Sequence, residues 1–152
     1  MSLAIITTIL VIVIDRLLKR WTTHSLMLHE SKAGIDGIFD FFYIHNDGAG
    51  FGVFSGKMWL FFIVTILIVS YLIYLIYRHR HAKWYLTLTY GLLLGGAIGN
   101  FIDRILYGYV IDMIRLQFMD FPIFNIADMA LSIGVVWLII QVLLDQNSED
   151  LL

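Results

Sequence analysis

The sequence predicts an all-α integral membrane protein with four transmembrane helices and a small extracytoplasmic β platform. Its 152 residues are 60% hydrophobic and only 14% charged. The mean hydropathy of +0.84 lies above what a water-soluble surface permits. Residues 58–77 and 84–102 carry no charged side chain, and each run is close to the ~20 apolar residues that span a hydrocarbon core.

A chain of this length fits one domain, residues 1–152. We expect transmembrane helices at about 3–21, 58–77, 84–104 and 124–144, and two outer loops at about 22–57 and 105–123.

The first helix is the least regular of the four, because its uncharged run ends at Asp15. Continuing the helix to Trp21 provides the length, and Asp15 then precedes Lys19 by one turn, a favourable order. Arg16 and Lys19 are expected to extend toward the membrane interface. A cleaved signal peptide is the alternative, but the segment has no basic region before the apolar run and no small-residue cleavage site after it. We therefore expect a retained helix.

The loop between the second and third helices is basic, with Arg78, Arg80 and Lys83. The positive-inside rule assigns this loop to the cytoplasm. Both termini are then cytoplasmic, and the two long loops face outward. Three cations at the end of the first helix contradict the rule, namely Arg16, Lys19 and Arg20. Asp15 neutralises part of that group.

The outer loops have strand character. Residues 37–56 alternate aromatic and β-branched side chains before a glycine-rich stretch, which predicts a strand or hairpin followed by a tight turn. Residues 107–118 are also typical of a strand. Two such segments on one side predict a β platform that lies over the helical bundle.

The third helix carries glycines at four-residue spacing, at Gly91, Gly95 and Gly99. Small residues on one face let a neighbouring helix approach closely. The same step reaches Asp103, so we expect Asp103 to point into the bundle, where an intramembrane acid is tolerated.

Two acids lack an obvious local role, Asp112 in "YVIDMI" and Asp128 in "FNIADM". Two carboxylates that meet in a poorly solvated site hold one proton between them. Such a pair can deprotonate water and protonate a leaving amine, as peptide hydrolysis without a metal requires. The alternatives are a solvated loop acid for Asp112 and a capping box with Asn125 for Asp128. A helix N-terminus favours a charged carboxylate, so Asp128 is expected to be the more ionised of the two.

Other chemistries lack support in the sequence. There is no cysteine, none of the five histidines has metal-ligand spacing, and no serine lies in a nucleophile-elbow pattern. The net charge of -2 gives no indication of a nucleic-acid partner. We expect no metal and no cofactor.

Five motifs together resemble the lipoprotein signal peptidases (signal peptidase II), a family of bacterial membrane aspartic peptidases. They are Asp15 with Lys19, "HNDGAGFG", "GGAIGNFIDR", "YGYVIDM" and "FNIAD". Their order along the chain and their positions relative to the four helices match the family over nearly the whole length.

The resemblance implies a role for each motif. Asp112 and Asp128 would activate the water that cuts a prolipoprotein before its diacylglyceryl-modified cysteine. Substrate-binding residues would be Asn46, Gly48 and Arg104. Residues that brace the catalytic pair would be Asn100, Asp103 and Asn125, with Asp15 and Lys19 as structural polar residues. Arg104 is expected to position substrate or lid without transferring a proton.

The resemblance also implies surroundings for the protein. The outer loops would form a β cradle and a lid, and the site would lie at the outer face of the bacterial cytoplasmic membrane. Expected partners are the modified prolipoprotein, membrane lipids and globomycin-type inhibitors, and the chain is expected to be a monomer.

Three residues depart from the family pattern, Gly50, Met113 and Met129. They keep the acid pair and are expected to change its walls. A specialised or inactive paralogue that binds lipopeptide is therefore an alternative. A proton-coupled transporter subunit with a relay of Asp15, Asp103 and Asp128 is another.

Overall fold

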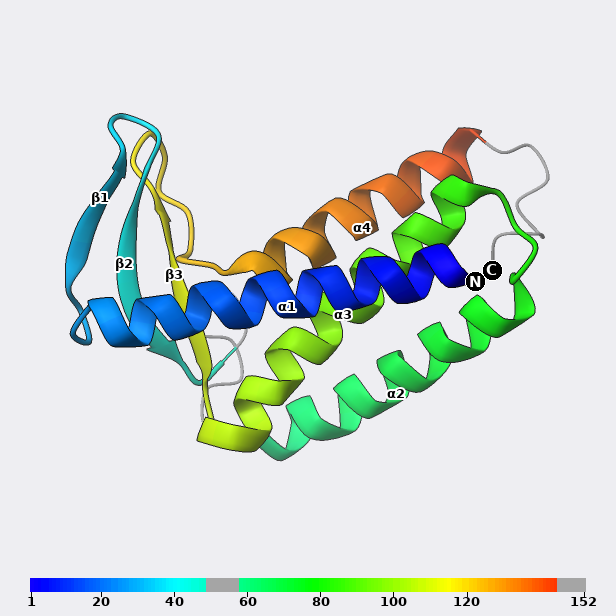
Figure 1. The fold of residues 1–152 in the computed structure, drawn as a ribbon, viewed down its shortest axis with the longest axis horizontal. Coiled ribbons are helices and arrows are strands. Elements are labelled where there is room, and N and C mark those ends of the chain that lie inside the picture. The colour runs from blue at the N-terminus through cyan, green and yellow to red at the C-terminus, as the bar shows by residue number, and fades with distance from the viewer. Residues whose placement is uncertain (49–57, 145–152) are drawn as a thin grey trace.

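The computed structural model describes residues 1–48 and 58–144, and within them it forms four helices and three strands. The four helices form a bundle, and the strands form a sheet at the end of the bundle far from the N-terminus (Figure 1). The predicted combination of four helices and a small β platform is confirmed. The elements are α1 (Ser2–Ser25), β1 (Ser31–Ile35), β2 (Phe39–Asn46), α2 (Met58–Arg78), α3 (Trp84–Tyr107), β3 (Val110–Leu116) and α4 (Ile126–Leu144).

Three of these helices, α2, α3 and α4, are long and apolar enough to cross a membrane by length and composition. α1 does not join them, since its second half carries Asp15, Arg16, Lys19 and Arg20. Its apolar side chains nevertheless point outward, and Leu17 is 64% exposed. A fourth span at α1 stays a prediction.

α3 is the central helix of the bundle. Its most apolar stretch is 61% buried, against 11% for α2 and 22% for α4. Glycine lets both neighbours approach, because a Cβ on Gly91 would lie 2.7 Å from Thr7 Cβ of α1, and one on Gly96 would lie 2.5 Å from the Ala127 carbonyl oxygen of α4. The predicted glycine face is confirmed against α1, and Gly96 adds a second close approach that the four-residue step misses.

The ends of the helices differ slightly from the predicted ones. α1 continues to Ser25 rather than ending near 21, and α3 continues to Tyr107 rather than ending near 104. α3 ends where Gly108 takes a left-handed conformation with φ 77°, and the Gly108 N–H donates to the Arg104 carbonyl. Glycine adopts this conformation at no steric cost.

The sheet is antiparallel in the order β1, β2, β3. Its inner side chains form a small core with the end of α1, which includes Leu26, Tyr43, Ile111 and Met113. The predicted strand character of both outer loops is confirmed. β1 was not predicted, because its five residues are all exposed and lack apolar alternation. The predicted tight turn falls mainly on residues 49–56, outside the described ranges.

The chain turns back after β3 and pairs with it once more. Ile114 and Phe124 form an isolated antiparallel bridge, in which the Ile114 N–H donates to the Phe124 carbonyl at 2.8 Å and the Phe124 N–H donates back at 3.1 Å. This bridge sets the residue after Phe124, and with it the start of α4, beside the middle of β3.

Candidate active site

Asp112 lies in the middle of β3 and is completely buried. It accepts hydrogen bonds from Asn46 Nδ2 at 2.8 Å and from Asn125 Nδ2 at 2.6 Å. Burial raises the pKa of Asp112 to about 7, and the charge of Asp128 acts in the same direction, while the two amide donors oppose the rise. Asp112 can therefore hold a proton near neutral pH.

Asp128 lies in the first turn of α4 and is only partly buried. Its backbone N–H donates to Asn125 Oδ1 at 2.9 Å, and the Asn125 N–H donates to Asp128 Oδ2 at 3.3 Å. The predicted capping box is thus present. The other carboxylate oxygen accepts a hydrogen bond from Asn100 Nδ2 at 2.6 Å. Capping leaves this second oxygen directed at the residues of the site, so the two interpretations of Asp128 are compatible.

Asn125 connects the two acids. Its Nδ2 contacts Asp112 and also lies 3.0 Å from Asn100 Oδ1, and its own side chain is fully buried. The predicted bracing residues Asn100 and Asn125 therefore contact the pair directly. Neither Asp112 nor Asp128 forms an ion pair within the described residues. Their hydrogen-bond donors are neutral amides.

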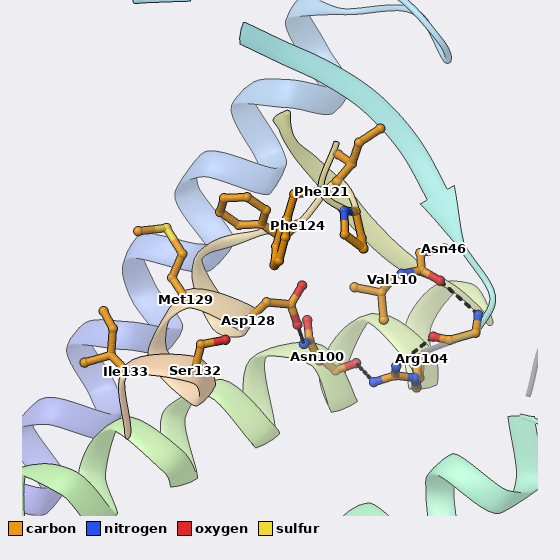
Figure 2. Close-up of a pocket in the computed structure, with 13 residues that line it drawn as sticks. Asn46, Asn100, Arg104, Val110, Phe121, Phe124, Asp128, Met129, Ser132 and Ile133 are labelled. Atoms are coloured by element: carbon orange, nitrogen blue, oxygen red, sulfur yellow. Dashed lines mark hydrogen bonds between the residues drawn. The ribbon is translucent and has the colours of Figure 1, made fainter. Parts of the chain in front are cut away.

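A cavity of about 490 Å³ opens beside Asp128 (Figure 2). Its polar lining residues are Asn46, Gly48, Asn100, Arg104 and Asp128. Asp112 does not line the cavity but accepts a hydrogen bond from Asn46, which does. The rest of the lining is mostly apolar, and this apolar wall includes Phe121, Phe124, Met129 and Ile133. Among these apolar residues the sequence predicted only Met129 as part of the wall. The "FPIF" segment was missed because it contains no polar residue that would mark it as part of a site. Met113 lies under the sheet in the small core rather than on the wall, and Gly50 is outside the described residues.

Arg104 extends from α3 toward the end of β2, across the cavity from Met129 (Figure 2). Its guanidinium donates to the Gly48 carbonyl at 3.4 Å and to the Asn100 carbonyl at 3.5 Å. The same group lies over the Phe61 ring at 4.6 Å. The structure therefore places the three predicted substrate-binding residues on one side of the cavity.

A second group of charges lies behind the site and consists of Asp15, Arg16, Lys19 and Asp103. We call it the ion cluster. Lys19 Nζ lies 2.9 Å from Asp15 Oδ2 and 2.7 Å from Asp103 Oδ2. Lys19 is 1% exposed, so the expectation that it extends to the interface is wrong. The two flanking carboxylates compensate its charge inside the bundle.

Arg16 also belongs to the ion cluster rather than extending freely to the interface. It forms an ion pair with Asp103 and lies 3.5 Å from Asp15. Helical spacing does not predict the contact of Arg16 with Asp103, because the two residues belong to different helices. The predicted inward direction of Asp103 is confirmed, since its side chain is fully buried.

The ion cluster holds the backbone next to each acid of the pair. Asp103 Oδ2 accepts from the N–H of Ile111, which precedes Asp112, at 3.1 Å. Asp15 Oδ1 accepts from the N–H of Ala127, which precedes Asp128, also at 3.1 Å. In addition, Lys19 Nζ lies 3.2 Å from Asn100 Oδ1. The cluster therefore positions both carboxylates through their neighbours.

No group of three or more His, Cys, Asp or Glu side chains within residues 1–48 and 58–144 is arranged to hold a metal ion. The chemistry that these residues can perform is general acid and base catalysis by two coupled carboxylates.

Comparison with known proteins agrees with this geometry. The family described as signal peptidase (SPase) II matches residues 7–144. A lipoprotein signal peptidase of Streptococcus pyogenes serotype M2 is 42% identical over 138 residues, which is 91% of each chain. One from serotype M5 is 41% identical over the same share.

Two solved structures of bacterial membrane enzymes have the same fold. One has a TM-score of 0.90 at 36% identity and covers 98% of this chain and 92% of its own. The other has a TM-score of 0.86 at 37% identity and covers 96% of both. The fold, the paired carboxylates and these similarities lead to one conclusion: the chain belongs to the signal peptidase II family of membrane aspartic peptidases.

Proposed function

We propose that Asp112 and Asp128 activate the water with which this signal peptidase cleaves a prolipoprotein before its diacylglyceryl-modified cysteine. The contacts and the position of the two acids support this proposal. Asn125 joins them, and Asp128 lines an open cavity, with no cation paired to either acid among the described residues.

The two acids have different surroundings, which suggests that one acts as the general base and the other as the general acid. Asp128 lies at the N-terminus of α4, where the helix dipole favours a negative charge. It would accept a proton from the water. Asp112, with a pKa raised to about 7 by burial, would hold its proton and donate it to the scissile carbonyl oxygen. When the tetrahedral intermediate collapses, Asp128 passes its proton to the leaving amine and the carbonyl oxygen returns a proton to Asp112, which restores the pair.

The walls of the cavity suggest how the substrate lies. Backbone groups of an extended peptide would hydrogen-bond to Asn46, the Gly48 region and Arg104 on the polar wall. The diacylglyceryl chains would lie along the apolar wall of Phe124, Met129 and Ile133, which continues onto the outward faces of α4. Arg104 would thereby position the peptide without exchanging a proton.

We further propose that all four helices span the bacterial membrane and that the sheet faces outward. The N-terminal ammonium group donates to the Arg80 carbonyl at 3.3 Å, so Met1 and the basic loop lie at the same end, opposite the sheet (Figure 1). The chain has no cysteine, so single variants Lys32→Cys and Arg80→Cys can report sidedness. A membrane-impermeant maleimide on whole cells should label the first and spare the second; the reverse pattern would overturn the topology.

The catalytic assignment is tested with Asp112→Asn and Asp128→Asn. Cleavage of a diacylglyceryl-modified precursor by purified protein should fall at least about 100-fold for each, since general acid and base catalysis contributes about 10² to 10⁴. Asp120→Asn changes an exposed acid of the loop before α4 and should leave the rate unchanged. Full cleavage by either variant of the pair would refute the assignment. A wild-type protein that binds lipopeptide without cleaving it would identify an inactive paralogue.

A further inference from the structure

A second cavity, of about 470 Å³, lies between the C-terminal half of α1 and the end of α3. The lining residues that matter are Arg16, Arg20, Thr23, His24, Leu106 and Tyr107. None of its lining residues lines the substrate cavity. The two cavities are therefore separate sites.

Two arginines in the lining have N–H donors that are not fully used by acceptors among the described residues. Arg20 is exposed, and no ion pair is formed by it within residues 1–48 and 58–144. Arg16 is paired with Asp103, yet its Nε is buried without a hydrogen-bond partner in the described part of the chain. A buried donor without a partner is costly, so an acceptor that entered this cavity would be stabilised.

His24 adds a further polar group. Its Nδ1 lies 2.8 Å from the Arg20 carbonyl oxygen, and because a carbonyl only accepts, Nδ1 carries the proton in this contact. No contact in the described residues occupies the other ring nitrogen, and this nitrogen donates to an anion when the ring is in its imidazolium form. The Thr23 hydroxyl lies next to this ring on the same exposed turn of α1.

Apolar side chains flank these polar groups on the outer surface of the bundle. Leu106 is 61% exposed, Tyr107 is 49% exposed, and Leu17 on α1 is 64% exposed. In a membrane protein such surface faces acyl chains, and tyrosine is typical of the level of the headgroups. A ligand that fits has an anionic group for the cations and acyl chains for the leucines.

We infer that this cavity binds the phosphate group of an anionic phospholipid, with the acyl chains along Leu17 and Leu106. Basic pockets between transmembrane helices on the cytoplasmic side bind anionic headgroups, and the same attraction between cations and a phosphate acts on a lipid of the outer leaflet. The inference accounts for a feature that the positive-inside rule leaves unexplained, namely the cations at the sheet end of α1. A phosphodiester would compensate Arg20 and reach Arg16.

The test is lipid binding by the full chain in detergent, followed by native mass spectrometry and thermal unfolding, with phosphatidylglycerol or phosphatidylcholine as the probe. Wild-type protein should bind one phosphatidylglycerol at least about fivefold more tightly than phosphatidylcholine, and Arg20→Gln/His24→Gln should lose that preference, since one basic residue near an anionic lipid is worth about fivefold. Equal binding of the two lipids by wild type would overturn the inference.

A matched variant controls for total charge. Lys32→Gln/His29→Gln removes one lysine and one histidine from exposed positions near the same end of the molecule, outside the cavity, and should keep the preference. If both double variants lose it equally, binding follows net charge and the site does not exist. Arg16 is left intact because its pairing with Asp103 supports the fold.

Two further measurements distinguish lipid binding from binding of a free anion and from the catalytic assignment. Inorganic phosphate at millimolar concentration should not reproduce the thermal stabilisation; if it does so with the same dependence on Arg20, the ligand is a free anion and the lipid assignment fails. Asp112→Asn should retain the lipid preference, because the readout is binding and does not depend on the catalytic assignment.

Discussion

The ion cluster and the Asp112/Asp128 pair are two groups of buried acids in one bundle, and they differ in the partners of those acids. In the ion cluster, Asp15 and Asp103 are balanced by Arg16 and Lys19. In the pair, the hydrogen-bond donors are neutral amides of asparagine and the backbone. Burying a charge costs free energy. In the ion cluster the paired cations offset this cost, whereas in the Asp112/Asp128 pair the cost remains.

The difference shows how one fold keeps some acids structural and others chemically available. A cation within about 3 Å of a carboxylate forms a charge-assisted hydrogen bond with it and holds the side chain in one position. An amide donor orients a carboxylate without cancelling its charge, so burial still acts on its pKa, as it does for Asp112. The ion cluster supplies rigidity to the pair through the backbone N–H groups of Ile111 and Ala127.

The largest effect is expected from Lys19→Met, which leaves Asp15 and Asp103 sharing one cation. Removing one partner of a buried ion pair costs about 3 to 5 kcal/mol, because a charge is left uncompensated. Unfolding in detergent should measure this loss. Lys19→Met/Asp103→Asn restores the charge balance with Asp15 and Arg16 and should recover part of the stability. Unchanged stability in the single variant would contradict the structural role of the cluster.

The opposite sign is expected from Asp112→Asn at high pH, where the variant removes the cost of a buried charge and should stabilise the fold. The pKa of Asp112 is about 7 in the folded protein and 3.8 ordinarily, so the folded state binds more protons between those values and wild-type stability falls as pH rises through them. The gain in free energy of unfolding should therefore be larger at pH 8 than at pH 5. The difference should be about 2 to 3 kcal/mol, because each pH unit between pH 5 and the pKa contributes about 1.36 kcal/mol. Asp120→Asn is the control, and a gain independent of pH would refute the role of burial.

The two groups meet where α4 begins, and Gly96→Ala tests that junction. A Cβ on Gly96 would lie 2.5 Å from the Ala127 carbonyl oxygen, so α4 must shift beside Asp128. We expect a loss of about 1 to 3 kcal/mol in stability and a fall in cleavage rate of up to about 100-fold, the effect of a misplacement of ~1 Å. A Cβ on Gly134 would meet side-chain atoms rather than backbone, namely Leu93 Cδ2 at 2.8 Å, Leu93 Cγ at 2.9 Å and Leu92 Cβ at 3.5 Å. Because this crowding lies about two turns along α4 from Asp128, Gly134→Ala should change the rate far less. Equal effects of the two variants would argue against a tight junction.

The smallest effect is expected from Asn46→Ala. The Asn46 amide stabilises ionised Asp112 and lowers its pKa. Its removal should raise that pKa, keep the proton on Asp112 to higher pH, and move the alkaline fall of kcat/KM upward by less than about one unit. His45→Gln, whose native side chain contacts Tyr43 and Tyr109 instead, should leave the profile in place. A shift to lower pH would contradict the assignment of Asp112 as the acid.

Much of the site was predictable because it depends on local patterns. The capping box of Asn125 and Asp128 follows from their spacing, and the inward direction of Asp103 follows from the glycine step on α3. The Asp15 and Lys19 pair also follows, because residues four apart on a helix are neighbours. These are contacts within one element or on one face of it.

Contacts between elements were not readable in the same way. The burial of Lys19 and the pairing of Arg16 with Asp103 depend on the distance between α1 and α3, which helical periodicity does not contain. The apolar wall of the cavity beside Asp128 arises from the turn back at Phe124, which pairs with Ile114 by backbone hydrogen bonds that no side-chain pattern encodes.

The class of the protein, its helices, the character of its outer strands and the order of its motifs were predictable, because composition, periodicity and motif spacing are properties of the chain. Which acids are balanced by cations, and which are not, follows from the packing of the folded chain. That choice depends on how closely α1, α3 and β3 approach one another, and it separates the structural acids from the two that are proposed to cleave the substrate.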